Sequence, residues 1–164
     1  MKFEIEWEGK TYECNWVEET DFEKLDKITS ILGFIFNEEG QLCLVNFPKK
    51  ENWCLPGGHL EDYDKSHLDC LIREVDEEAD LVLKDITPLG YIESKVKGEK
   101  EIADRQLRFV AKVDKMNPQT IDPAEGIIPE RKFIDPKEFV EHTGWIGGNG
   151  LLQLNKALEI LNKK

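Results

Sequence analysis

Apolar and polar residues alternate near the start of the chain. The apolar positions of this alternation are Phe3, Ile5, Trp7, Tyr12, Cys14 and Trp16. A period of two is typical of half-buried strands, and Gly9 interrupts it with a turn residue. The pattern therefore predicts an N-terminal β-hairpin.

Further strands are predicted where apolar and β-branched residues run together between turn signals. They lie at 28–36, 42–47, 82–96, 106–113 and 132–134. The segment 82–96 contains Pro88, which cannot donate a hydrogen bond to a neighbouring strand, so we expect a break there. The acidic, proline-containing stretch 117–130 is predicted to be a loop.

A helical period appears at 66–79, where apolar residues recur every three or four positions. Ser66 or Asp64 can cap its start. A short helical turn is expected within 21–27, a helix is expected after Asp135-Pro136, and a final helix is expected at 151–161, preceded by a turn at 147–150. The order of elements predicts an α/β (α+β) fold with a mixed sheet covered by helices. We expect a single domain, 1–164, with 1–27 as the hairpin extension and 28–164 as the core.

Composition narrows the function classes. The chain has 164 residues and a net charge of −12, which opposes binding to long nucleic acids. None of the four cysteines forms a C-x-x-C pair, no signal peptide is recognisable, and no apolar run approaches the roughly 20 residues that span a bilayer. We expect a cytoplasmic protein that does not bind membranes, and a homodimer is left open.

The predicted helix 66–79 carries an acidic face. Glu74, Glu77 and Glu78 are spaced i, i+3, i+4, so their carboxylates share one side of the helix. Such a triplet on its own is most often a solvated surface. Here Gly57-Gly58 precedes it and Arg73 adjoins it, and oxygen ligands of this kind suit Mg²⁺ or Mn²⁺.

The segment from Gly57 to Leu81, with Arg73-Glu74-Val75-Asp76-Glu77-Glu78 at its centre, resembles the Nudix box. Two departures stand out. The spacing before Arg73 is one residue too long, so the first family glutamate corresponds to Asp64 or is missing with Lys65 in its place. The family glycine near the helix end is Asp80, a residue type that accepts the left-handed conformation.

The resemblance implies an α/β/α sandwich and a metal-dependent hydrolase that cuts a diphosphate linkage in a small nucleoside diphosphate derivative. By similarity, Glu74, Glu77, Glu78 and the Gly57 carbonyl would bind the metal, and Arg73 would orient the glutamates. The general base would be Glu74 or a loop acid, for which Glu130 is preferred over Glu125.

Substrate contacts are predicted less specifically. Arg108 could meet a phosphate, as could Arg105, and the two are not expected to share a face of their strand. Asn149 and Trp145 precede the last helix, where an amide and a ring could meet a base; capping that helix is the alternative role of Asn149. A non-catalytic nucleotide-binding or sensing module on the same fold is the alternative function. The charge and the absence of a basic helix disfavour an RNA-decapping relative, and no cysteine-based isomerase site is recognisable.

Overall fold

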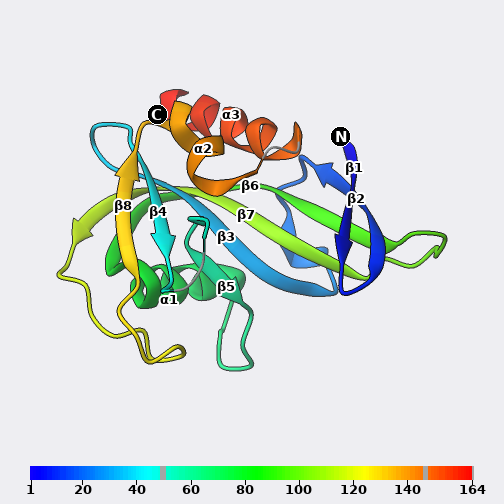
Figure 1. Ribbon diagram of the computed structural model, residues 1–164, viewed down its shortest axis with the longest axis horizontal. Helices are drawn as coiled ribbons and strands as arrows, with labels where there is room; N and C mark the ends of the chain where they lie inside the picture. Colours follow the sequence, from blue (N-terminus) through cyan, green and yellow to red (C-terminus); the bar gives the residue numbers. More distant parts are fainter. Residues whose placement is uncertain (49–50, 146–147, 164) are drawn as a thin grey trace.

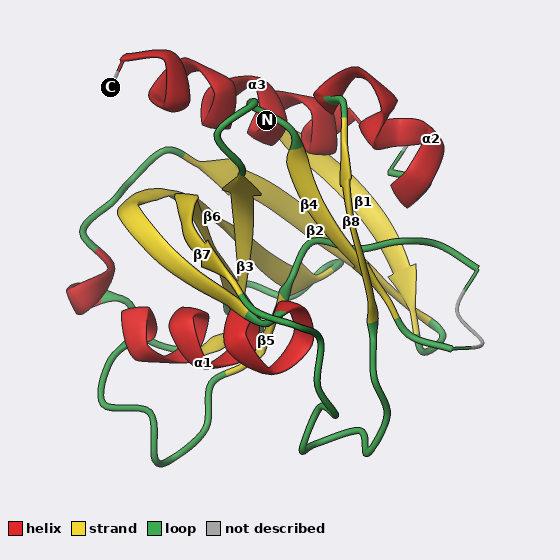
Figure 2. Cartoon of the chain, turned by 90° about the vertical axis from the view of Figure 1, so that its left-hand side faces the viewer, coloured by secondary structure: helices red, strands yellow, loops and turns green. Residues whose placement is uncertain are grey.

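The computed structural model describes residues 1–48, 51–145 and 148–163. It consists of one mixed sheet with helices on both faces (Figure 1). Figure 2 shows α1 (His67–Ala79) on one side of the sheet and α2 (Phe139–Thr143) and α3 (Gly148–Lys163) on the other. The predicted mixed α/β architecture is confirmed.

The sheet has eight strands in the order β1-β2-β6-β7-β3-β4-β8, with β5 paired to β3 outside this path. Only β3 and β7 are parallel among the described pairs. The strands are β1 (Lys2–Trp7), β2 (Lys10–Val17), β3 (Ile28–Phe36), β4 (Leu42–Asn46), β5 (Gly57–His59), β6 (Leu81–Val96), β7 (Asp104–Met116) and β8 (Glu130–Ile134). Short 3-10 turns occupy Phe22–Lys24 and Pro136–Glu138.

The predicted hairpin forms from β1 and β2. Glu8 and Gly9 connect the strands, both with positive φ (48° and 74°), as expected for the two-residue turns that match the strand twist. Strand β2 then pairs antiparallel with β6, from Tyr12 opposite Val96 to Val17 opposite Tyr91. The hairpin therefore continues the main sheet.

Strand β3 explains why the sheet needs helices on both faces. Ile31 and Ile35 pack in the cluster that includes Leu71 and Val75 of α1. Phe34 and Phe36 point the other way, into the cluster that includes Phe139 of α2. Because successive side chains of a strand alternate between faces, a continuous apolar run is what a strand covered on both sides requires.

Three local expectations were wrong or incomplete. Strand β6 runs through Pro88 without ending; the missing donor is accommodated by shifts in the pairing register with β7 around that residue. Residues 148–150 belong to α3 instead of a turn, and residue 147 of the expected turn lies outside the described residues. Strand β5 was not predicted, because its glycines carry no periodic signal.

The four cysteines are free thiols, as expected. Among the described residues, no helix combines the length and apolarity that crossing a membrane requires.

Candidate active site

Helix α1 is fixed at both ends by side chains. Ser66 caps its start, since the Ser66 hydroxyl accepts a hydrogen bond from the Asp69 N–H at 3.1 Å. Asp80 ends it in the left-handed conformation (φ 50°, ψ 45°), as the sequence indicated. The Asp80 carboxylate also accepts bonds from the Thr120 N–H and hydroxyl, at 2.7 and 2.8 Å. The residue that ends the helix thus ties the loop before β8 to it.

The glycine pair of β5 lies directly against the acidic face. The Gly57 N–H donates to Glu78 Oε2 at 2.8 Å, and Gly57 has a φ of 142°. A Cβ atom on Gly58 would lie 2.5 Å from the carboxyl carbon of Glu74. Glycine at position 58 therefore lets the Glu74 carboxylate approach the backbone of β5 closely, whereas glycine at position 57 is required by its φ and by the Ile31 carbonyl oxygen, which a Cβ atom would meet at 2.1 Å.

Arg73 links the acids to one another. Its guanidinium donates to both oxygens of Asp64 (2.9 and 2.8 Å), to Glu74 at 2.8 Å and to Glu77 at 3.1 Å. The Arg73 side chain is 18% exposed, and those of Asp64, Glu74 and Glu77 are 3%, 13% and 22% exposed. These pairs are therefore mostly shielded from water, and they fix the directions of the carboxylates.

The single positive charge of Arg73 does not balance the carboxylates of Asp64, Glu74 and Glu77. Burial raises the pKa of Glu74, Arg73 opposes the rise, and the charges of Glu77 and Asp122 add to it. Arg73 holds the pKa of Asp64 down to about 2. An additional positive charge near Glu74 would stabilise its ionised form.

The donor set fits a hard divalent cation, because Glu74, Glu77 and Glu78 offer carboxylate oxygens on one helix face beside the β5 backbone. In the described part of the chain, however, no three His, Cys, Asp or Glu side chains are already arranged to hold a metal ion. Glu74 and Glu77 face Arg73, and Glu78 faces the Gly57 N–H. These contacts use Oε1 of Glu74 and Oε2 of Glu77 and Glu78, so a bound cation need not displace Arg73 or the Gly57 N–H.

The loop before β8 supplies an acid that sequence reasoning missed. Asp122 is 3% exposed, and its charge acts on Glu74. Its Oδ1 accepts the N–H groups of Ala124 and Glu125 at 2.7 and 3.2 Å. The preferred candidate, Glu130, is exposed and opens β8 opposite Asn46, while Glu125 is exposed in the loop. The stretch 117–130, predicted as an irregular loop, gives no period by which to choose among its three acids.

Arg108 and Asn149 are brought together by a third residue, Gln153. Arg108 Nε donates to Gln153 Oε1 at 2.9 Å, and Gln153 Nε2 donates to Asn149 Oδ1. Arg108 is 1% exposed, and burial lowers its pKa to about 10. Both predicted residues line a hollow of about 380 Å³ together with Trp145. Asn149 lies within α3 and is not its cap.

Arg105 is engaged elsewhere, as the expectation of different faces implied. Its guanidinium pairs with Asp26 at 2.5 Å and with Glu93 at 3.5 Å. Both partners are carboxylates of the chain itself, and they neutralise positive charge that Arg105 could otherwise offer a phosphate.

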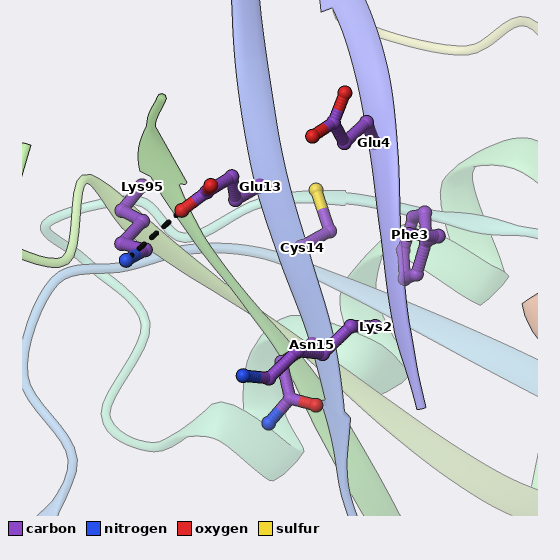
Figure 3. Close-up of a pocket in the computed structure, with 7 residues that line it drawn as sticks. All are labelled: Lys2, Phe3, Glu4, Glu13, Cys14, Asn15 and Lys95. Atoms are coloured by element: carbon purple, nitrogen blue, oxygen red, sulfur yellow. Dashed lines mark ion pairs between the residues drawn. The ribbon is translucent and has the colours of Figure 1, made fainter. Parts of the chain in front are cut away.

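Two further hollows adjoin the hairpin. One of about 490 Å³ lies between the hairpin and the starts of β3 and β7, and His59, directly after Gly58, contributes to its lining. The other, of about 330 Å³, lies over β1 and β2 (Figure 3). There Lys95 and Glu13 neutralise each other at 2.9 Å, so we assign that hollow no chemistry.

The sequence and the geometry lead to the same family. Residues 26–154 match the family model of the NUDIX domain. The chain belongs to the Nudix family. None of the curated proteins matches it in sequence.

Solved structures share the Nudix fold with this chain. A mutant of the pyrophosphohydrolase BsRppH from Bacillus subtilis has 16% identity and a TM-score of 0.70, and the match covers 96% of each chain. An ADP-ribose pyrophosphatase from Streptococcus suis has 20% identity and a TM-score of 0.54, over 80% of this chain and 89% of the other. An Ap4A hydrolase from C. elegans has 15% identity and a TM-score of 0.57, over 82% and 99%. At these identities the likeness establishes the fold.

The two departures from the Nudix box have structural solutions. Despite the extra residue between Asp64 and Arg73, Asp64 reaches Arg73 through two hydrogen bonds. Asp80 adopts the left-handed conformation that the family glycine would provide. The altered spacing therefore leaves Arg73 in contact with Asp64, Glu74 and Glu77.

Proposed function

We propose that the protein is a metal-dependent hydrolase that cuts the diphosphate linkage of a nucleoside diphosphate derivative, such as a nucleotide, a nucleotide sugar or ADP-ribose. The observation that carries this proposal is the acidic face of α1, where Gly57-Gly58 lies against Glu78 and Glu74 and where Arg73 pairs with Glu74 and Glu77. The chain's membership of the Nudix family supports the reaction class.

The metal would be Mg²⁺ or Mn²⁺, held by Glu74, Glu77, Glu78 and the Gly57 carbonyl. When bound, such a cation neutralises charge on the phosphate oxygens and lowers the pKa of bound water. Arg73 acts as a positioning residue, because its ion pairs hold Glu74 and Glu77 in place.

In the reaction, the oxygen of a water molecule attacks a phosphorus atom and the bond from that phosphorus to the bridging oxygen breaks. A carboxylate takes the proton of the water as general base. We assign this step to Glu74 or to a loop acid. Asp122 is the loop acid that the geometry favours, because it is buried and its charge acts on Glu74, whereas Glu130 is exposed.

A small substrate fits the charge of the chain. The net charge of −12 repels a long phosphate polymer, whereas a cation at the acidic face screens a short one. The names of the similar structures include a pyrophosphohydrolase, an ADP-ribose pyrophosphatase and an Ap4A hydrolase, which agrees with this substrate class.

The test is an activity panel of nucleoside triphosphates, nucleotide sugars, ADP-ribose and dinucleoside polyphosphates, each assayed with Mg²⁺, with Mn²⁺ and with chelator. We expect metal-dependent release of phosphate, pyrophosphate or a nucleoside monophosphate from at least one compound. Glu78→Gln should reduce turnover at least a hundredfold, whereas Asp76→Asn, an exposed acid on the same helix, should leave it unchanged.

Two results would overturn the proposal. One is the absence of metal-dependent hydrolysis across the whole panel. The other is equal loss of activity in Glu78→Gln and Asp76→Asn. Nucleotide binding without turnover would point to the alternative, a binding or sensing module on the same fold.

A further inference from the structure

Strand β1 forms an open edge of the sheet. Among the described strands it pairs only with β2, in an antiparallel register. The Trp16 N–H donates to the Met1 carbonyl oxygen at 2.9 Å, and hydrogen-bonded pairs alternate along an antiparallel ladder, so the odd-numbered positions of β1 bond to β2. The main-chain N–H and C=O groups that point away from β2 are therefore those of Lys2, Glu4 and Glu6. An open edge of this kind is a template for a further strand.

The two faces of β1 differ in character. The odd-numbered residues are apolar, and Ile5 and Trp7 are 42% and 61% exposed. The even-numbered residues are all exposed and charged, namely Lys2, Glu4 and Glu6. Side chains that lie opposite each other on one face of a sheet interact directly. A strand that fits this edge therefore has an apolar face and, on its other face, charges of complementary sign.

A second copy of β1 meets both requirements. When two copies run antiparallel about a twofold axis at Glu4, Lys2 of one copy lies opposite Glu6 of the other at both ends of the contact. The free groups of all three even-numbered positions then pair, which gives roughly six main-chain hydrogen bonds. Glu4 meets its own counterpart on the axis, but Lys97 of the same chain pairs with each Glu4 at 2.9 Å. We propose that the protein forms a twofold dimer through its β1 strands.

Other registers fit this strand less well. A shift by one residue would place the apolar face of one strand against the charged face of the other. A shift by two residues in one direction puts Glu4 of one copy opposite Glu6 of the other, so like charges meet. The same shift in the other direction leaves Glu6 without an opposite residue and shortens the contact. The charges and the two-residue period therefore select the register that is centred on Glu4.

The test is sedimentation equilibrium of the untagged full chain, and it does not depend on whether the protein hydrolyses diphosphates. At about 0.15 M salt, charges more than about 8 Å apart are largely screened, so the net charge of −12 on each copy should not prevent association. The contact is small for a protein interface, so association should depend on concentration. We expect the average mass to rise with concentration from 19.0 kDa toward twice that value.

Charge reversal tests the register. Lys2→Glu and Glu6→Lys should each weaken dimerisation at least tenfold, because each places like charges opposite each other at both ends. An equimolar mixture of the two variants should dimerise again, because opposite charges then face each other at both ends. The matched control is Lys115→Glu, the same charge change at an exposed position of β7, which should leave dimerisation unchanged.

Proline substitution tests the main chain. Glu4→Pro removes an N–H that points away from β2, so the monomer should keep its thermal unfolding midpoint while the dimer is lost. Ile5→Pro removes an N–H that bonds to β2 and should lower that midpoint.

Three results would overturn the dimer proposal without affecting the proposed function. The first is a mass of 19.0 kDa at every concentration. The second is a dimer that Lys2→Glu, Glu6→Lys and Glu4→Pro leave unchanged, or a mixture of the two charge variants that does not associate. The third is growth beyond the dimer mass, which would mean that β1 pairs with a different edge, such as β8, in an open chain of copies.

Discussion

Replacing Gly58 by alanine should disable the active site while leaving the fold intact. The added Cβ would lie 2.5 Å from both Cδ and Oε2 of Glu74, whereas ordinary contacts begin at 3.4 Å. The carboxylate must therefore retreat by roughly 1 Å. A misplacement of about 1 Å in a catalytic constellation reduces the rate by about a hundredfold, equivalent to roughly 2.7 kcal/mol of activation free energy.

The assay compares kcat/KM with Mg²⁺ and the thermal unfolding midpoint for wild type and Gly58→Ala. The φ of Gly58 lies outside the left-handed region, so alanine adds no backbone strain and the midpoint should change little. Gly33→Ala is the steric control, because its Cβ would meet core side chains, Ile35 at 2.6 Å and Leu71 at 3.0 Å, and not the acids. It should lower stability by about 1–3 kcal/mol and leave kcat/KM near wild type.

Gly57→Ala should differ from Gly58→Ala in its effect on stability. Its φ is 142°, and its Cβ would lie 2.1 Å from the Ile31 carbonyl oxygen, so this variant should lose stability and not only activity. If Gly58→Ala folds and retains wild-type kcat/KM, then either Glu74 does not act where the structure places it or its position is not critical. That result would refute the reasoning.

Three other changes test separate contacts. Asp122→Asn should lower kcat at least tenfold while Glu130→Gln leaves it within twofold, and the reverse pattern in steady-state kinetics would transfer the loop role to Glu130. Asp64→Asn should lower the free energy of unfolding by about 2 kcal/mol, because Arg73 lowers the pKa of Asp64 from 3.8 to about 2. Because that pKa is depressed, the wild type should lose the same contribution as pH falls from about 4 toward 2. Denaturant titrations at several pH values measure this free energy of unfolding. If it falls equally steeply with pH in the wild type and in Asp64→Asn, the ion pair is contradicted. Burial raises the pKa of Cys14 to about 11, so its alkylation, followed by mass spectrometry, should accelerate about tenfold per pH unit between pH 8 and 10, and a plateau near pH 9 would contradict the burial effect.

Local patterns in the sequence were sufficient to predict most of the helices and strands. The alternation of residues 3–16 defined the hairpin, and the three-to-four spacing of 66–79 defined α1 with Ser66 as its cap. Each depends on interactions between residues close in the chain, whose spacing reports directly on the face they share. Pro88 was misjudged because the neighbouring strand β7 absorbs its missing donor through a register shift, a property of the pair and not of the segment.

Some features of the candidate site follow from the sequence alone, and others depend on the tertiary structure. The sequence by itself determined that Glu74, Glu77 and Glu78 share a helix face beside Arg73, because one helical period fixes their relation. Only the tertiary structure decided that Gly58 lies against Glu74, that Asp122 is the buried loop acid, and that aromatic residues of the hairpin line a hollow together with the starts of β3 and β7. These relations join residues that lie 16 or more positions apart, and they exist only once strand pairing and burial bring the segments together.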